Sequence, residues 1–325
     1  MTVSKTDAPT HSAPTSGKHT VRMLVFTVLA VLFLALAALR LFGVDGNRYT
    51  AALLALTPYW TASGMVLGIV ALATRHWWIG AGTVAVAVAL VAALLPRMVP
   101  ATEQPPAAGR QLRIMSSNLY LGRADAKAIV DLAREHRVDV LNLLELTPRE
   151  AGELERAGLF DLLPYRVFQP VSNGVGSGIA SRYPLTELNL TGPSVLRQPS
   201  ARVDLGGVAI EVVAVHVLPP TTSAGTWKSE IAGLPRPGEP VRILAGDFNA
   251  TLDHATFRGL LDAGYTDAAD RTGSGFAPTW PSRGFLPPVT IDHILVDARV
   301  TVNAYRVLEV PDSDHHAVYA ELTLP

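Results

Sequence analysis

The stretch VRILAGDFN at residues 241–249 joins a mostly apolar run to a turn that carries polar groups. Its first five residues are typical of a strand that is buried on both faces of a sheet. Because a rigid strand end holds side chains firmly at the edge of a sheet, we expect Asp247 and Asn249 to project toward a ligand. Taken alone, an Asp and an Asn after a glycine are also ordinary turn residues.

The same arrangement recurs along residues 110–325. Apolar runs at 111–115, 138–144, 208–215 and 290–296 lead into or contain polar residues, and residues 124–136 have the spacing of an amphipathic helix. Each polar residue has a structural explanation when it stands alone, but six such positions in one chain favour a shared site. The six motifs contain Asn118, Glu145, His216, Asp247 with Asn249, Asp292 with His293, and Ser313-Asp314-His315.

In this order, the motifs resemble those of the endonuclease/exonuclease/phosphatase superfamily, over about residues 110–325. The GDFN and SDH elements with an intervening Ile-Asp pair are specific together, whereas the isolated Asn and Glu motifs are weak. The resemblance implies an α/β fold, a four-layer α/β sandwich of the DNase I type with two mixed sheets flanked by helices. It also implies hydrolysis of a phosphate ester with Mg²⁺ or Mn²⁺.

The resemblance also implies roles for the motif residues. Hydrolysis of a phosphate ester needs a deprotonated water, neutralised phosphoryl oxygens and help for the leaving oxygen. Metal positioning is expected from Asn118, Glu145 and Asp314, since Mg²⁺ prefers oxygen ligands. Alternatively, Asp314 supports its loop. The expected catalytic residues are His216, Asp247, Asn249, Asp292 and His315.

The division of roles among the catalytic residues stays open. His315 acts as general base or contacts the phosphate, with Asp292 fixing its tautomer. Asp247 orients water or protonates the leaving oxygen, and His216 matches a second histidine of the nuclease and sphingomyelinase branches. The chain departs from the family pattern at Leu144 and Ser117, where Gln and Trp are common, but neither change removes a group of the site.

Composition separates the chain into two regions. Hydrophobic residues make up 49% of the 325 residues and charged residues 17%, with the apolar excess before residue 100. Residues 104–325 hold 20 Lys and Arg against 25 Asp and Glu, which argues mildly against nucleic acid as the main partner. The chain has no cysteine, which excludes disulfides and thiolate nucleophiles.

Three apolar stretches, at about 21–43, 50–73 and 77–95, are each long enough to cross a bilayer as a helix. A cleaved signal peptide is the alternative for the first, although its apolar core is too long and two more stretches follow. Residues 1–20 are expected to be a disordered cytoplasmic tail, 21–95 three transmembrane helices, 96–109 a proline-rich linker and 110–325 the enzyme domain.

Loop charges predict the orientation. Lys5, Lys18 and Arg22 precede the first span, so the positive-inside rule places the N-terminus in the cytoplasm. Three spans then place the enzyme domain outside the cytoplasm, in a multi-pass protein of the cell membrane. This layout resembles that of actinobacterial membrane proteins of the VanJ type, which are associated with teicoplanin resistance.

Two substrate classes follow. That resemblance implies a lipid-linked phosphate ester, possibly of the undecaprenyl type, whereas a membrane-tethered nuclease acting on DNA or RNA is the alternative. The loop at residues 276–288, FAPTWPSRGFLPP, is expected either to face the substrate or to pack as a surface loop. A scaffold with a degenerate enzyme domain is disfavoured, because no expected catalytic group is missing.

Overall fold

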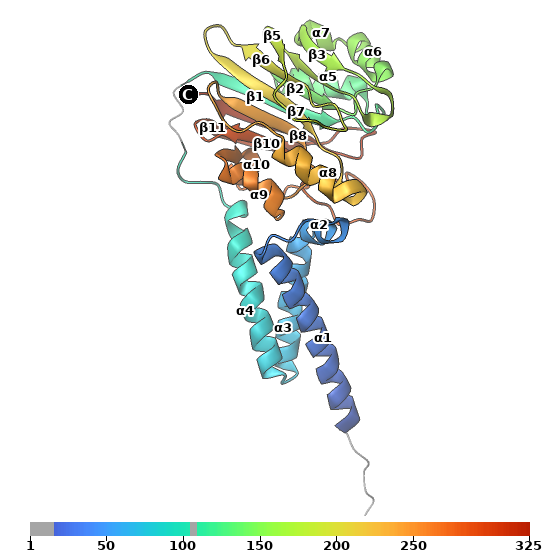
Figure 1. Ribbon diagram of the computed structural model, residues 1–325, viewed down its shortest axis with the longest axis vertical. Coiled ribbons are helices and arrows are strands. Elements are labelled where there is room, and N and C mark those ends of the chain that lie inside the picture. The colour runs from blue at the N-terminus through green and yellow to red at the C-terminus, as the bar shows by residue number, and fades with distance from the viewer. Residues whose placement is uncertain (1–15, 105–108) are drawn as a thin grey trace, which may run out of the picture. The chain divides into compact units, whose positions relative to one another are not determined.

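The computed structural model describes residues 16–104 and 109–325, which form two compact units (Figure 1). One unit contains residues up to 37 together with 59–90, and the other contains 38–58 together with 91–325. Most of the predicted N-terminal tail and residues 105–108 of the predicted linker lie outside the described residues.

The first unit is helical. It is built from most of three helices, α1 (Ser16–Leu41), α3 (Thr57–Ala73) and α4 (Trp77–Leu94). Within it, Phe33 packs with Ala87 and Leu90, and a Cβ added at Gly68 would lie 2.7 Å from a methyl group of Val84. Small residues at such contacts allow apolar helices to approach closely.

Among the described residues, two helices are long and apolar enough to cross a membrane, at residues 19–41 and 77–98. The second predicted span, at 50–73, is broken into α2 (Arg48–Ala55) and α3, which are bent by 69°. Counting this pair as one span gives three. Pro58 stands in the first turn of α3, a position where the missing N–H and fixed φ of proline are tolerated.

The second unit contains two six-stranded mixed sheets packed face to face, as the motif order predicts. The first has the strand order β11-β12-β1-β2-β4-β3 and the second β5-β6-β7-β8-β10-β9. Buried Val, Ile, Leu and Ala side chains from both sheets form the core between them. The strands are β1 (Gln111–Asn118), β2 (Val140–Leu144), β3 (Tyr165–Gln169), β4 (Ser177–Ser181), β5 (Leu185–Leu188), β6 (Ser200–Asp204), β7 (Ala209–His216), β8 (Arg242–Asp247), β9 (Tyr265–Asp267), β10 (Asp292–Asp297), β11 (Thr301–Leu308) and β12 (Ala317–Thr323).

Helices cover the outer faces of both sheets. Helix α5 packs Ile129, Val130 and Ala133 against the first sheet with the help of α6 and α7, while α8 and α9 cover the second (Figure 1). This gives the expected four layers. The remaining elements are α5 (Ala126–Glu135), α6 (Pro148–Arg156), α7 (Leu159–Leu162), α8 (Pro220–Ala232), α9 (Ala255–Asp262), α10 (Ala268–Arg271) and the 3₁₀ turns η1 (Leu95–Met98) and η2 (Ser172–Gly174).

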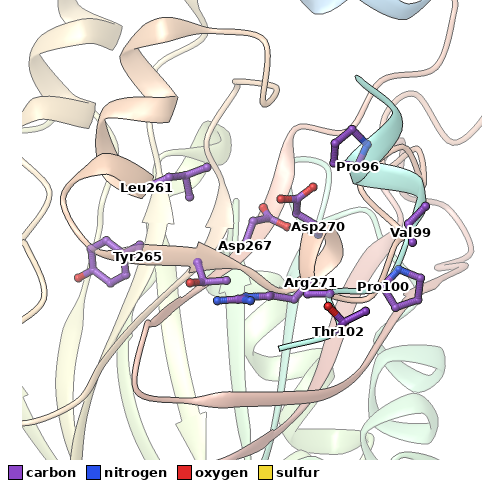
Figure 2. Close-up of a pocket in the computed structure, with 11 residues that line it drawn as sticks. Pro96, Val99, Pro100, Thr102, Leu261, Tyr265, Asp267, Asp270 and Arg271 are labelled. Carbon is purple, nitrogen blue, oxygen red and sulfur yellow. Dashed lines mark hydrogen bonds between the residues drawn. The ribbon is translucent and has the colours of Figure 1, made fainter. Parts of the chain in front are cut away.

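The start of the predicted linker is packed on the enzyme domain. Arg97 in η1 is buried and bonds to both carboxylate oxygens of Asp253, at 3.0 and 3.1 Å. Pro100 pairs with Thr272 in an isolated β-bridge. Figure 2 shows the cavity of about 550 Å³ beside this contact, lined by linker residues and by Asp267, Asp270 and Arg271. Residues 96–101 are therefore held by the domain.

Candidate active site

Strand pairing brings the predicted motifs together. In the first sheet, parallel β1 and β2 end together, with Asn118 level with Leu144 and Glu145 next along the chain. In the second sheet, Asp247 pairs with His216 of parallel β7 on one side and with Asp292 of antiparallel β10 on the other. The polar groups therefore gather at one edge of the two sheets.

Gly246 allows the central strand to reach this edge. An added Cβ at this residue would lie 1.9 Å from the backbone oxygen of Val215, so any side chain would force β7 and β8 apart. The close approach sets Asp247 beside His216. This steric requirement explains why the GDFN motif begins with glycine.

Asn118 and Glu145 form a pair. The Asn118 amide donates to Glu145 Oε1 at 3.1 Å, and the backbone N–H of Leu121 donates to Glu145 Oε2 at 2.7 Å. Burial raises the pKa of Glu145, against the effect of these hydrogen bonds. Glu145 has a φ of 57° in the left-handed region, which costs about 1–2 kcal/mol and is typical of strain at functional sites.

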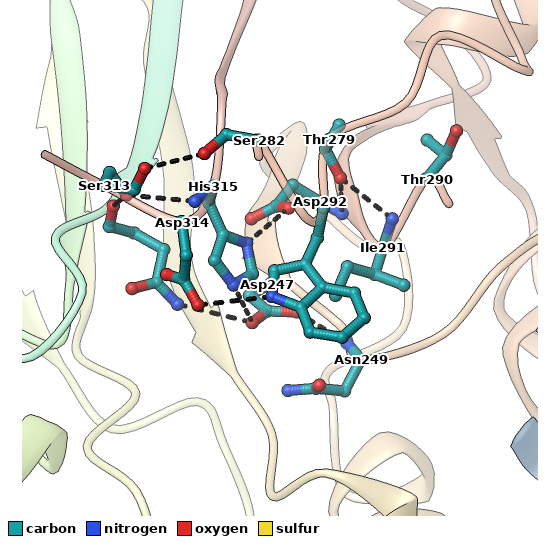
Figure 3. Close-up of polar contacts among 12 residues, drawn as sticks. Asp247, Asn249, Thr279, Ser282, Thr290, Ile291, Asp292, Ser313, Asp314 and His315 are labelled. Carbon is teal, nitrogen blue, oxygen red and sulfur yellow. Dashed lines mark hydrogen bonds and ion pairs between the residues drawn. The ribbon is translucent and has the colours of Figure 1, made fainter. Parts of the chain in front are cut away.

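His315 lies between two carboxylates (Figure 3). Its Nδ1 is 2.9 Å from Asp292 Oδ2, while its Nε2 is 3.9 Å from Asp247 Oδ2. Burial alone would lower the pKa of His315, but the Asp292 carboxylate outweighs it and raises that pKa to about 10. His315 is therefore an imidazolium at neutral pH in the metal-free site, and Thr279 holds Asp292 by accepting its backbone N–H at 3.1 Å.

Asp247 is poised to exchange a proton near neutral pH. Burial and the charge of Asp292 raise its pKa to about 7, although His315 acts in the opposite direction. Its Oδ1 accepts the backbone N–H of Asn249 at 2.8 Å. The surroundings thus give Asp247 and His315 different pKa values, about 7 and about 10. Such a difference between neighbouring groups is typical of an acid–base pair.

His216 is a neutral imidazole. Burial, followed by the charge of His315, lowers its pKa to about 3. Its Nε2 is 3.9 Å from Glu145 Oε1, and its buried Nδ1 has no hydrogen-bond partner among the described residues. Asn249 completes this side of the site and donates from its amide to the Val217 carbonyl at 3.0 Å.

Asp314 lies at the rim, where its Oδ2 accepts the indole N–H of Trp280 at 3.3 Å. Its buried Oδ1 has no partner in the described part of the chain. Ser313 ties this loop to the first sheet because its hydroxyl donates to the Asn118 carbonyl at 2.8 Å.

The donor set fits a divalent cation. Ligand atoms of Asp247, Asp292 and His315 lie within 4.8 Å of one another, and Glu145 is close to this group. Within the described residues, no Lys or Arg ion pair neutralises these carboxylates. Because His315 Nδ1 is already bonded to Asp292, the Glu145 carboxylate beside Asn118 suits the ion better than the Asp–His pair does.

One motif residue lies elsewhere. His293 points away from the cluster, with Nδ1 bonded to Asp267 at 2.6 Å and Nε2 donating to the Ala250 carbonyl. This buried pair supports the loop that follows Asn249.

A cavity of about 460 Å³ opens onto the residues predicted to be catalytic, and sequence reasoning missed one of its walls. Glu145, His216, Asp247, Asn249 and His315 line one part of it. The remainder includes Trp280, Leu286 and Pro287 from the loop at residues 276–288, together with residues of α2. The apolar pattern of α2 indicated only a membrane span.

Solved structures share this fold. An endonuclease/exonuclease/phosphatase from Beutenbergia cavernae DSM 12333 aligns with a TM-score of 0.51 at 19% identity, covering 66% of this chain and 72% of that one. A humanized D. rerio TDP2 with 14 mutations gives 0.53 at 18% identity, covering 65% and 98%. A family protein from Leptotrichia buccalis C-1013-b gives 0.51 at 15% identity, covering 65% and 99%.

No curated protein matches the chain at the level of sequence. The model of the Endonuclease/Exonuclease/phosphatase family, however, matches residues 115–315, which span all the motifs described above. Members of this superfamily are metal-dependent hydrolases of phosphoester bonds. With its two facing mixed sheets and its acidic, histidine-containing site, this chain belongs to the endonuclease/exonuclease/phosphatase family.

Proposed function

We propose that this protein is a membrane-anchored, divalent-metal-dependent phosphoesterase that hydrolyses an envelope or lipid-linked phosphate ester outside the cytoplasm. The observation that carries the proposal is the lining of the active-site cavity, which is mostly apolar beyond the catalytic groups and contains no Lys or Arg among the described residues. A nuclease groove normally presents basic groups to the nucleic-acid backbone. An apolar lining suits a phosphate attached to hydrocarbon.

Asn118 and Glu145, with Asp314 at the rim, would hold the ion, which is Mg²⁺ or Mn²⁺ in this proposal. When bound, it neutralises charge on the phosphoryl oxygens and acidifies a water. The raised pKa of Glu145 and the unpartnered oxygen of Asp314 both support the assignment, since buried carboxylates gain from a cation.

The remaining residues act on protons and on the phosphate. Asp247, with a pKa of about 7, accepts a proton from the attacking water, and the His315 imidazolium donates a hydrogen bond to a phosphoryl oxygen. Asp292 holds that imidazolium in orientation. Asn249 and neutral His216 provide further hydrogen bonds to the phosphate.

The ends of the apolar helices support three spans. Arg40, in the last turn of α1, bonds to Asp253 at 2.8 Å, and Arg97, just after α4, bonds to the same carboxylate. If α1 and α4 both cross the membrane, these ends share one side and the chain must return between them. With 17 residues, α3 is about 26 Å long, close to the thickness of the hydrocarbon core.

One preparation of full-length protein tests this function. We expect Mg²⁺- or Mn²⁺-dependent phosphate release from a polyprenyl phosphate or pyrophosphate to exceed the nicking of plasmid DNA, and His315→Ala or Asp247→Ala to abolish it. Faster nicking would favour the nuclease. A C-terminal alkaline phosphatase fusion should be active and a green fluorescent fusion dark, and the reverse pattern would contradict the orientation.

A further inference from the structure

One wall of the active-site cavity comes from the start of the second apolar stretch. Helix α2 lines the cavity with Ala52, Ala55 and the adjoining Leu56. Leu286 and Val289 contribute apolar side chains from the loop before β10. One part of the cavity is therefore lined by the residues proposed to bind the phosphate, and another part by apolar side chains.

Helix α2 is fixed to the enzyme domain by specific bonds. His254 accepts the backbone N–H of Thr251 on Nδ1 at 2.9 Å, so its Nε2 carries the proton and donates to the Ala51 carbonyl at 2.9 Å. Before the helix, Asp45 accepts the backbone N–H of Thr256 at 2.7 Å and pairs with Lys228 at 3.2 Å. These contacts lie within one compact unit, so the wall belongs to the site.

Helix α2 packs on the domain through Ala51 and Leu54, which are each only 1% exposed. Ala51, Ala52, Ala55 and the adjoining Leu56 line the cavity, whereas Leu54 does not. The phosphate of a substrate does not bury this apolar surface. An alkyl group attached to the phosphate can, and each methylene buried there raises the affinity for the substrate about fourfold.

We propose that α2 and residues 286–289 form a subsite for the hydrocarbon next to the phosphate of a lipid-linked substrate, with Leu56 and Leu286 as specificity-determining residues. The inference rests on the proposed function. It assigns to α2, at the start of the second apolar stretch, a part in substrate selection.

Full-length protein in lipid nanodiscs is the sample for the test. Two substrate series are used, n-alkyl phosphate monoesters and n-alkyl p-nitrophenyl phosphate diesters, each with methyl, butyl and octyl members. For the series that is hydrolysed, the readout is the ratio of kcat/KM for octyl to methyl. We expect a ratio of about ten or more in the wild type.

The variants Leu56→Gln and Leu286→Gln should each lower this ratio about fivefold to tenfold. Leu53→Gln is the matched control, because Leu53 is 39% exposed on the same helix and does not line the cavity. Leu286 is 60% exposed, so a glutamine there is compatible with folding. It therefore tests the subsite even if Leu56→Gln unfolds.

The outcomes separate the two levels of the proposal. Equal kcat/KM values for methyl and octyl esters in the wild type would contradict the subsite but not the phosphoesterase activity. An octyl-to-methyl ratio in Leu56→Gln and Leu286→Gln that equals the ratio in Leu53→Gln would do the same. A failure to hydrolyse either series with Mg²⁺ or Mn²⁺, or faster plasmid nicking, would overturn the proposed function and the subsite with it.

Discussion

The contact between Asp292 and His315 makes the substitution Asp292→Asn informative. The carboxylate is buried, 2% exposed, and lies 2.9 Å from His315 Nδ1. Asparagine keeps the shape of the side chain but removes its charge. The imidazolium then remains in a buried site without its closest counter-ion.

The size of the effect follows from the pKa of His315. It stands at about 10 against an ordinary value of 6.5, even though burial lowers it. At about 1.4 kcal/mol per unit, the carboxylates favour the imidazolium by up to about 5 kcal/mol. Since only part of this is expressed in the transition state, we expect kcat/KM to fall by about 10²–10⁴-fold.

The assay is metal-dependent hydrolysis of the best substrate between pH 5 and 9. In the variant, the pKa of His315 falls because its closest counter-ion is lost, so the imidazolium disappears as pH rises through this lower value. The alkaline limb of the pH–rate profile should therefore lie at lower pH than in the wild type. The control is Asp312→Asn, at an exposed residue. A rate within threefold of wild type with an unchanged pH profile would refute the role assigned to His315.

Further predictions concern stability and the metal. Asp253→Asn should lower the thermal midpoint of the full-length protein by several degrees, because two guanidinium groups lose their shared carboxylate, worth about 3–5 kcal/mol; an unchanged midpoint would contradict this. Burial, then the charge of Glu153, raises the pKa of Glu150 from 4.5 to about 7, so its ionisation destabilises the fold progressively as pH rises from 4.5 to 7. Glu150→Gln should increase the free energy of unfolding at pH 8 by about 1–2 kcal/mol after solvent screening, and so raise the thermal midpoint there. At pH 4.5 the midpoint should not change, and equal effects at both pH values would count against an ionised Glu150. Chelation with EDTA should abolish hydrolysis, with recovery on adding Mg²⁺ or Mn²⁺, and persistent activity would argue against the ion site.

The motifs predict the fold class and the residues of the site because each motif is a short, continuous stretch of sequence. Polar residues directly after apolar runs stay at strand ends in any arrangement of the sheets. Thus Asp247 and Asp292 could be expected at one sheet edge before their pairing was seen. The raised pKa of Asp247 could not be expected, because it depends on burial and on charges brought close by distant segments.

Tertiary structure alone decided the second role of the apolar region. Hydropathy runs unbroken from residue 50 to 73, but it cannot distinguish a residue that faces lipid from one that packs on protein. The bond from His254 to the Ala51 carbonyl, across 203 positions, makes α2 part of the enzyme unit. The sequence by itself therefore determined the family, whose motifs are contiguous in the chain, and those motifs contain the residues proposed to be catalytic. The apolar wall and the Asp253 contacts required the fold, because they join segments with no local pattern in common.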